Sequence, residues 1–167
     1  MMPSKNLVFS TDDVSSENLK YFEYWDMVKD KVPDLKVIAF VIAEGLDDRF
    51  ERWYQSHKDW VEIGVHCYNH ERPQEAWRED QEFWIAKARD ILLPYLPENY
   101  LYRPPGFRVL SKTEKVLKDL GFAGIAHQSH IKYFSGRTLD VYNTHCTKDK
   151  YENPIGEIWK TIIAENR

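Results

Sequence analysis

The chain has 167 residues, carries a formal net charge of −4, and is 43% hydrophobic and 14% aromatic. This length and apolar content suffice for the core of one domain, and we expect a single domain over residues 1–167. The negative charge argues against nucleic acid as a partner, and no apolar run approaches the ~20 residues of a membrane span. Because the first residues show no signal-peptide pattern, we expect a cytoplasmic location. No sequence feature indicates an oligomeric state.

Short apolar runs alternate with helical patterns along the whole chain. The run at residues 36–43 is apolar nearly throughout, as a strand covered on both faces should be. The predicted strands cover residues 7–10, 36–43, 60–65, 100–102, 122–126 and 138–142. The predicted helices carry apolar residues at helical spacing and cover residues 15–32, 47–57, 74–93, 111–120 and 153–163.

A strand followed by a helix, repeated along the chain, predicts parallel strands with helices outside them. About six strands are too few for an ordinary eight-stranded barrel, which needs ~250 residues. We therefore predict an α/β fold: a distorted, incomplete (β/α) barrel of about six to seven mostly parallel strands with outer helices. In such folds functional groups gather at the carboxyl ends of the strands. The polar residues expected at that rim are Asp12, Asp13, His66, Arg103, His127 and His145.

The first motif is the pair Asp12-Asp13, directly after the first predicted strand. Two adjacent carboxylates in a partly buried site cannot both ionise cheaply unless a cation is near. A metal would resolve this by binding one carboxylate and leaving the other as a base. The alternative is a helix N-terminus, where aspartate is also favoured.

The second motif consists of two histidines, His66 and His70, after the third predicted strand. A spacing of four suits two imidazoles on one metal, in a helix or in a tight loop. Asn69 and Pro73 favour the loop, and Cys67 stands where a zinc-protease helix would need glutamate.

The third motif, Arg103-Pro104-Pro105-Gly106, predicts a stiff loop after a short strand. Proline restricts the backbone, and glycine lets a substrate approach the main chain closely. The arginine can pair with a free carboxylate. The alternative is a surface turn.

Together these motifs resemble those of the polysaccharide deacetylases, the nodulation-type sugar N-deacetylases of carbohydrate esterase family four. The family pattern runs Thr-x-Asp-Asp, His-Ser/Thr-x-x-His, Arg-x-Pro and Leu-x-His. The similar segments here are residues 10–13, 66–70, 103–105 and 143–145, in the same order. The resemblance spans most of the chain and implies a distorted (β/α) barrel of about seven strands.

The resemblance also implies roles for the residues. Asp13, His66 and His70 would hold one divalent metal, with zinc expected first and cobalt, nickel or manganese as alternatives. Asp12 would be the general base that deprotonates a metal-bound water, and Arg103 would pair with Asp12 and keep it ionised.

Further roles concern the substrate side of the site. His145 would be the general acid that protonates the departing nitrogen. Pro105 and Gly106 would form the substrate loop, with the Gly106 N–H as donor to the developing oxyanion. His127 and His130 stand where the family carries its fourth motif, an Asp and Trp pair. They are candidates for substrate binding, and exposed or packed loop histidines are the alternative.

The chain departs from the family pattern at several positions. Cys67 replaces the usual Ser/Thr, and a thiol donates more weakly than the hydroxyl that helps to brace the loop. Asn143 stands where an aliphatic residue is usual, and Gly106 stands where many relatives carry Tyr followed by Gly. The chain is also short for the family, so we expect a more open site.

The resemblance implies a metal-dependent hydrolase that removes N-acetyl groups from an amino sugar or oligosaccharide. The expected partner is a carbohydrate or a small N-acyl compound. One alternative is hydrolysis of another non-peptide C–N bond, in a cyclic amide or a formamide, on the same site. The non-enzyme alternative is a degenerate module that binds sugar without turnover.

Overall fold

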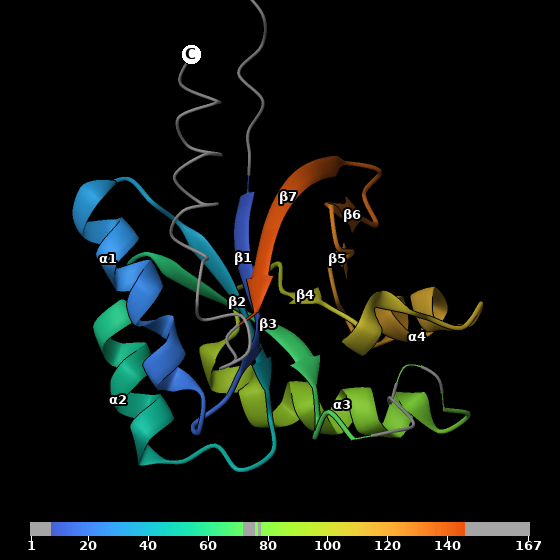
Figure 1. Ribbon diagram of the computed structural model, residues 1–167. Helices are drawn as coiled ribbons and strands as arrows, with labels where there is room; N and C mark the ends of the chain where they lie inside the picture. Colours follow the sequence, from blue (N-terminus) through green and yellow to red (C-terminus); the bar gives the residue numbers. More distant parts are fainter. Residues whose placement is uncertain (1–7, 72–75, 77, 146–167) are drawn as a thin grey trace, which may run out of the picture.

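Seven strands form a closed barrel in the computed structural model, which describes residues 8–71, 76 and 78–145 (Figure 1). The strands are β1 (Val8–Val14), β2 (Val37–Ile42), β3 (Val61–Cys67), β4 (Leu101–Tyr102), β5 (Gly124–Ala126), β6 (His130–Tyr133) and β7 (Thr138–His145). The order around the barrel is the order in sequence, and β7 closes it by pairing with β1. Only β6 runs antiparallel to its neighbours. The predicted distorted barrel of mostly parallel strands is confirmed, one strand short of the regular eight.

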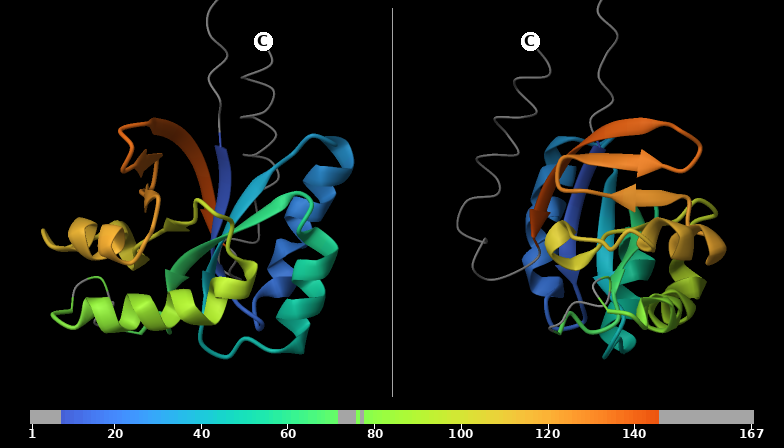
Figure 2. Two further views of the ribbon diagram at one scale, coloured as in Figure 1. Left: turned by 180° about the vertical axis from the view of Figure 1, so that it is seen from behind. Right: turned by 90° about the vertical axis from the view of Figure 1, so that its right-hand side faces the viewer.

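Helices cover the outside of the barrel. Figures 1 and 2 show α1 and α2 side by side on one flank, while α3 packs against β3 and α4 against β5. The helical segments are η1 (Leu19–Phe22), α1 (Glu23–Lys31), α2 (Asp48–His57), α3 (Gln81–Leu92), η3 (Leu93–Tyr95), η4 (Pro105–Phe107) and α4 (Thr113–Asp119). In the part of the chain that the structure describes, none of the helices is long and apolar enough to cross a bilayer.

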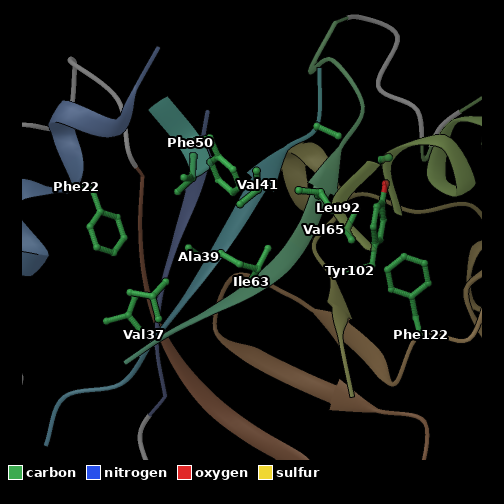
Figure 3. Packing of buried hydrophobic residues seen from close by; sticks show 14 of the residues in the cluster. Phe22, Val37, Ala39, Val41, Phe50, Ile63, Val65, Leu92, Tyr102 and Phe122 are labelled. Atoms are coloured by element: carbon green, nitrogen blue, oxygen red, sulfur yellow. The ribbon is translucent and has the colours of Figure 1, made fainter. Parts of the chain in front are cut away.

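The core has two layers because side chains alternate between the two faces of a strand. The outer layer lies under the helices, where Figure 3 shows Val41 of β2 and Val65 of β3 in one cluster with Phe50 of α2. The inner layer fills the barrel and consists of Ile38, Phe40, Leu101, Ala126, Ile131 and Val141. The barrel interior is therefore a packed core, and functional side chains at the carboxyl ends of the strands stand on it.

The first strand is longer than predicted, and its extra length includes both aspartates. The prediction ended at residue 10, whereas β1 continues to Val14. Its register against β2 shifts between Thr11 and Val14, and Asp13 has a φ of 59° at that irregularity. A bulge of this kind re-aims one side chain without ending the strand, and hydrophobic periodicity does not encode it. The alternative of a helix N-terminus for the aspartate pair is therefore wrong.

The strand β6 was missed by the sequence prediction, which left residues 127–137 without a strand. β6 pairs antiparallel with β5 and with β7, and the turn into β7 contains Gly136 with a φ of 97°. Only Ile131 of its four residues is fully buried. A strand this short with one buried residue has too little alternation to be recognised from sequence.

Two helix predictions also need comment. The helix predicted over residues 74–93 begins in the structure at Gln81, and α3 and η3 cover the rest. Residues 72–75 and 77 lie outside the described residues, as does the helix predicted over residues 153–163. A single domain over the whole chain stays a prediction.

One contact between α1 and α2 predicts a pH-dependent stability. His57 Nε2 lies 2.8 Å from Asp26 Oδ1, and His57 Nδ1 lies 2.6 Å from the backbone oxygen of Trp53. Burial lowers the pKa of His57, but the bonds to Asp26 and Trp53 outweigh it and raise the pKa above its ordinary value. A histidine whose pKa is raised by folding stabilises the folded state fully at pH values below its unfolded-state pKa of ~6.5. This stabilisation is lost as the pH rises through the folded-state pKa.

We expect the urea midpoint of the parent protein to fall between about pH 6 and about pH 8. The midpoint of Asp26→Asn, which lacks the charged partner, should fall less over the same range. Asp30→Asn, an exposed position on the same helix, is the matched control and should keep the parent's dependence. An Asp26→Asn variant with the same pH dependence as the parent would exclude this ion pair as its source.

Candidate metal centre and acid–base site

The three predicted metal ligands come together at the carboxyl ends of β1 and β3. Asp13 Oδ1 lies 3.2 Å from His66 Nε2 and 3.2 Å from His70 Nε2. The three ligating atoms all lie within 4.8 Å of one another. One carboxylate and two imidazoles form a donor set suited to a divalent transition metal such as zinc or cobalt. The residues present therefore fit a single metal ion.

The backbone at these ligands adopts a conformation that side chains usually avoid. Among the described residues, three that are not glycine have positive φ: Asp13 at 59°, His70 at 52° and Phe107 at 57°. Such conformations cost free energy and persist where the surrounding structure imposes them, often at functional sites. Two of the three are predicted ligands, and the third ends the Arg-Pro-Pro-Gly loop.

The ring of His66 is oriented by a second contact. Its Nδ1 lies 2.7 Å from the backbone oxygen of Arg103. A hydrogen bond from Nδ1–H to this oxygen leaves the Nε2 lone pair for a metal, the usual arrangement of ligating histidines. Burial lowers the pKa of His66, but the hydrogen bond to Asp13 and the charges of Asp12 and Asp13 outweigh it and raise the pKa. A metal must displace that proton, so affinity should fall as the pH falls.

Burial and the charge of His66 lower the pKa of His70.

The loop that carries His70 packs against α3. The ring of Tyr68 lies 5.3 Å from that of Trp84, and Lys87 Nζ lies 3.9 Å from the Tyr68 ring centroid. Aromatic and cation–π contacts of this kind stabilise a loop without a hydroxyl donor. They act where Cys67, which is buried, replaces the hydroxyl of the family pattern.

A buried ion pair joins β1 to β4. Arg103 Nη1 lies 2.5 Å from Asp12 Oδ1, and the two side chains are 0% and 1% exposed. The guanidinium carbon lies 4.0 Å from the ring centroid of Phe40, in the inner layer of the core. Burial lowers the pKa of Arg103 against the opposing effect of Asp12, but arginine stays a cation in proteins. The pairing of Arg103 with Asp12 that the sequence suggested is present.

The Phe40 ring that contacts Arg103 packs directly against Gly64 of β3, where a larger residue would collide with it. A Cβ atom at position 64 would lie 2.5 Å from Cε1 of the Phe40 ring. We expect Gly64→Ala to lower the free energy of unfolding by ~1–3 kcal/mol, because the ring must move within a packed core. Urea denaturation measures this, and Phe40→Leu in the same chain should recover part of the loss. If Gly64→Ala matches the parent in stability, the ring has room to shift.

Asn143 of β7 belongs to the same cluster, although no role was predicted for it from the sequence motifs. Its Nδ2 donates to Asp12 Oδ2 at 2.8 Å. Its Oδ1 accepts from Ser10 Oγ at 3.1 Å and from Arg103 Nη1. Asn143 stands two residues before His145, hence on the same face of the strand, so the period-two pattern was a signal that could have found it.

The predicted acid, His145, is the last residue of β7. Asp12 and His145 are partners in the parallel register of β1 and β7. Neighbouring strands lie about 4.8 Å apart, so the backbone brings the predicted base and the predicted acid to adjacent positions on one rim. The side chain of His145 lies outside the described part of the structure.

The predicted substrate residues lie on two segments of the rim. Pro105 is buried, and Gly106 is exposed with a φ of 65°, so the chain turns sharply after Arg103-Pro104. At the β5–β6 turn the rings of His127 and His130 stack at 4.7 Å. Burial, and then the charges of His130, Lys132 and Arg103, lower the pKa of His127. A role in substrate binding stays a prediction for all four predicted residues.

Solvent exposure increases across this site from the ion pair to the ligand cluster. The exposed fraction rises from 0% at Arg103 and 1% at Asp12 to 15% at Asp13 and 36% at His70. The ion pair is therefore enclosed, while the ligand cluster is open on the His70 side. A metal with an open coordination position next to a held carboxylate is the arrangement that metal-assisted hydrolysis requires.

No protein-family model matches the sequence, and no curated protein matches it significantly. Several solved structures share the fold. A pseudoenzyme of carbohydrate esterase family 4 (CE4) from Bacillus anthracis is 14% identical over 98% of this chain and 63% of its own, with a TM-score of 0.64. A peptidoglycan N-acetylglucosamine deacetylase is 18% identical over 96% of this chain and 81% of its own, with a TM-score of 0.68. A family 4 acetyl xylan esterase from Clostridium thermocellum, in complex with a cobalt ion, is 14% identical over 95% of this chain and 82% of its own, with a TM-score of 0.63.

These neighbours match the family that the sequence motifs resemble, and at such identities they establish the shared fold. The chain spans less than two thirds of the length of the Bacillus anthracis pseudoenzyme, of which a mutant has restored enzymatic activity. Both active and inactive proteins therefore use this barrel, so activity has to be argued from the residues of the site.

Proposed function

We propose that this chain is a metal-dependent hydrolase that removes N-acetyl groups from an amino sugar or oligosaccharide. The observation that carries the proposal is the difference in surroundings between two adjacent aspartates. Asp13 faces two imidazoles, whereas Asp12 faces a buried arginine and an amide. Hydrolysis of an amide needs a cationic centre and a separate base beside it, and this pair supplies one carboxylate for each task.

Asp13, His66 and His70 would hold the metal, with zinc expected first and cobalt, nickel or manganese as alternatives. When bound, a divalent metal supplies a positive charge that polarises the acyl carbonyl and lowers the pKa of a water molecule. Asp12 takes the proton from the attacking water, and Arg103 pairs with the Asp12 carboxylate and orients it. The enclosure of this ion pair strengthens its electrostatic effect on the reacting atoms.

The later steps use the rest of the rim. The backbone N–H of Gly106 donates to the oxyanion that develops from the acyl carbonyl. His145 gives a proton to the departing nitrogen, because an amine is a poor leaving group while it is unprotonated. Pro105 holds the loop that borders the substrate, and His127 and His130 contact the sugar.

One observation supports an N-acetylated sugar as the substrate, and two others support an accessible hydrolytic site. One structural neighbour is a peptidoglycan N-acetylglucosamine deacetylase. The ligand cluster is open to solvent at His70, which suits a substrate that enters from outside the barrel. A base, an arginine partner, three candidate ligands and a candidate acid occur together in this chain. That complete set favours turnover over sugar binding alone.

The test is acetate release from chitin oligomers, peptidoglycan fragments and nucleotide sugars, with metal-free protein and after addition of zinc or cobalt. We expect metal-dependent acetate release from at least one of these substrates. Ring opening of a cyclic amide or release of formate, without acetate, would favour the other C–N hydrolase. Sugar binding without any product would favour a degenerate binding module. A protein that binds none of the metals would exclude both hydrolases.

A further inference from the structure

We propose that Asn143 is a positioning residue for Asp12, an inference that rests on the proposed function. Asn143 touches neither the ligand cluster nor the expected substrate loop in the contacts described above. It acts on the reaction through the orientation of the Asp12 carboxylate. The family pattern has an aliphatic residue at this position, which could not donate the hydrogen bond that Asn143 donates to Asp12.

The hydrogen bonds determine which way the Asn143 amide points. Its Oδ1 faces two donors, the Ser10 hydroxyl and Arg103 Nη1, and its Nδ2 faces Asp12 Oδ2. The opposite orientation would set an N–H group against the arginine and an oxygen against the carboxylate, which loses both of these bonds and leaves only the contact to Ser10, whose hydroxyl can donate or accept. The amide is therefore a directed connector between a cation and an anion.

These bonds hold the Asp12 carboxylate at both oxygens. Arg103 Nη1 binds Oδ1 at 2.5 Å, and Asn143 Nδ2 binds Oδ2 at 2.8 Å. A carboxylate held at one oxygen can rotate about its Cβ–Cγ bond, but contacts at both oxygens define its plane. Each carboxylate oxygen can accept two hydrogen bonds, so the contact to Asn143 is compatible with proton transfer to Asp12. General base catalysis depends steeply on such alignment.

Asn143 also aligns the arginine. Nη1 of Arg103 donates to both Asp12 Oδ1 and Asn143 Oδ1. In the described part of the structure, the Nε and Nη2 atoms of Arg103 have no hydrogen-bond partner. The guanidinium is thus held through one nitrogen, and Asn143 supplies one of the two acceptors there.

The test uses two substitutions of Asn143. Asn143→Asp keeps the shape and the acceptor for Ser10 and Arg103, but it replaces the donor to Asp12 Oδ2 with an oxygen and sets a second carboxyl group against Asp12, which disfavours the ionised base. Asn143→Leu removes both functions and introduces the aliphatic side chain of the family pattern. Ser10→Ala is the matched control, because it removes a hydrogen bond from the same network but leaves the bond from Asn143 to Asp12.

We expect Asn143→Leu to lower kcat by about tenfold or more, which corresponds to the loss of one aligned hydrogen bond, and Asn143→Asp to lower kcat at least as much. In Asn143→Leu, KM and zinc affinity should stay at parent values, since the ligand cluster and the substrate loop are unchanged. Ser10→Ala should keep the parent kcat even if its unfolding midpoint falls. A network with only a structural role would instead lower stability in all three variants without a selective loss of kcat.

Two outcomes would overturn the inference while the proposed function stands. One is a folded Asn143→Asp or Asn143→Leu variant with the parent kcat, and the other is a loss of kcat in Ser10→Ala equal to theirs. If Asn143→Leu does not fold, the nearly isosteric Asn143→Asp carries the test. A parent protein that releases no acetate would overturn the proposed function and the positioning role together, which is a distinct result.

Discussion

Asp12→Asn is expected to lower kcat by about 10²–10⁴-fold while zinc binding persists, because an amide cannot accept the proton of the attacking water. The proposed ligand atoms belong to Asp13, His66 and His70, which the change does not touch. Acetate release and calorimetric zinc titration of the same preparation measure the two properties. Their separation distinguishes a general base from a metal ligand.

The substitution has a structural side effect that needs a control. Removing the carboxylate leaves the buried Arg103 without its counter-ion, and breaking a buried ion pair in this way costs about 3–5 kcal/mol. The new amide also meets the donor Nδ2 of Asn143 at the place where Asp12 Oδ2 accepted. A loss of activity in this variant could therefore come from local unfolding.

The double variant Asp12→Asn/Asn143→Asp separates these effects. It exchanges the amide and the carboxylate between two side chains that lie 2.8 Å apart, so the net charge is kept and Arg103 retains an anionic partner. We expect the double variant to regain stability relative to Asp12→Asn, to bind zinc, and to stay inactive. Recovery of parent kcat in the double variant would show that no carboxylate is needed at position 12.

His66→Ala is expected to abolish both metal binding and activity. In the proposed site three ligands would hold the ion, and His66 is the most buried of them at 3% exposure. Loss of residues that only support a ligand weakens metal binding about 10–100-fold, so loss of a ligand itself should exceed that. Calorimetric zinc titration measures the dissociation constant, and acetate release at saturating zinc measures the residual activity.

The buried position of His66 calls for two comparison variants. The change to alanine leaves the backbone oxygen of Arg103 without its donor and opens a cavity, which together lower stability. His66→Gln retains a polar side chain that can donate to that oxygen but has no imidazole. His130→Ala removes a histidine outside the ligand cluster and should keep the parent zinc affinity. Parent-like zinc binding by folded His66→Gln would contradict the assigned ligand set.

Much of the candidate site could be predicted from sequence because most of its residues stand at or shortly after the end of an apolar run. A strand in this fold delivers its last residues to one rim of the barrel, whatever separates the strands in sequence. His66 at the end of β3 and Arg103 just after β4 illustrate this. Because side chains alternate along a strand, Ser10 and Asp12 share one face of β1, and Asn143 and position 145 share one face of β7.

Other features could not be predicted because they depend on contacts between distant segments. Regular alternation would point Asp12 and Asp13 to opposite faces of β1, and the irregularity that changes this at Asp13 arises where β1 pairs with β2. The role of Asn143 depends on its register against Ser10, across 133 residues of sequence. β6 owes its existence to pairing with β5 and β7, since its own four residues carry almost no strand signal.

The sequence by itself determined the type of fold and the identity of the chemical groups at its rim. Apolar periodicity and the spacing of polar residues are local properties, and they predicted a barrel with aspartates, histidines and an arginine at one end. Only the tertiary structure showed that Asn143 joins the pair of Asp12 and Arg103, and that β1 is irregular where both aspartates reach the rim. These features follow from strand register and from a backbone irregularity, and both are settled when segments far apart in the chain pack against each other.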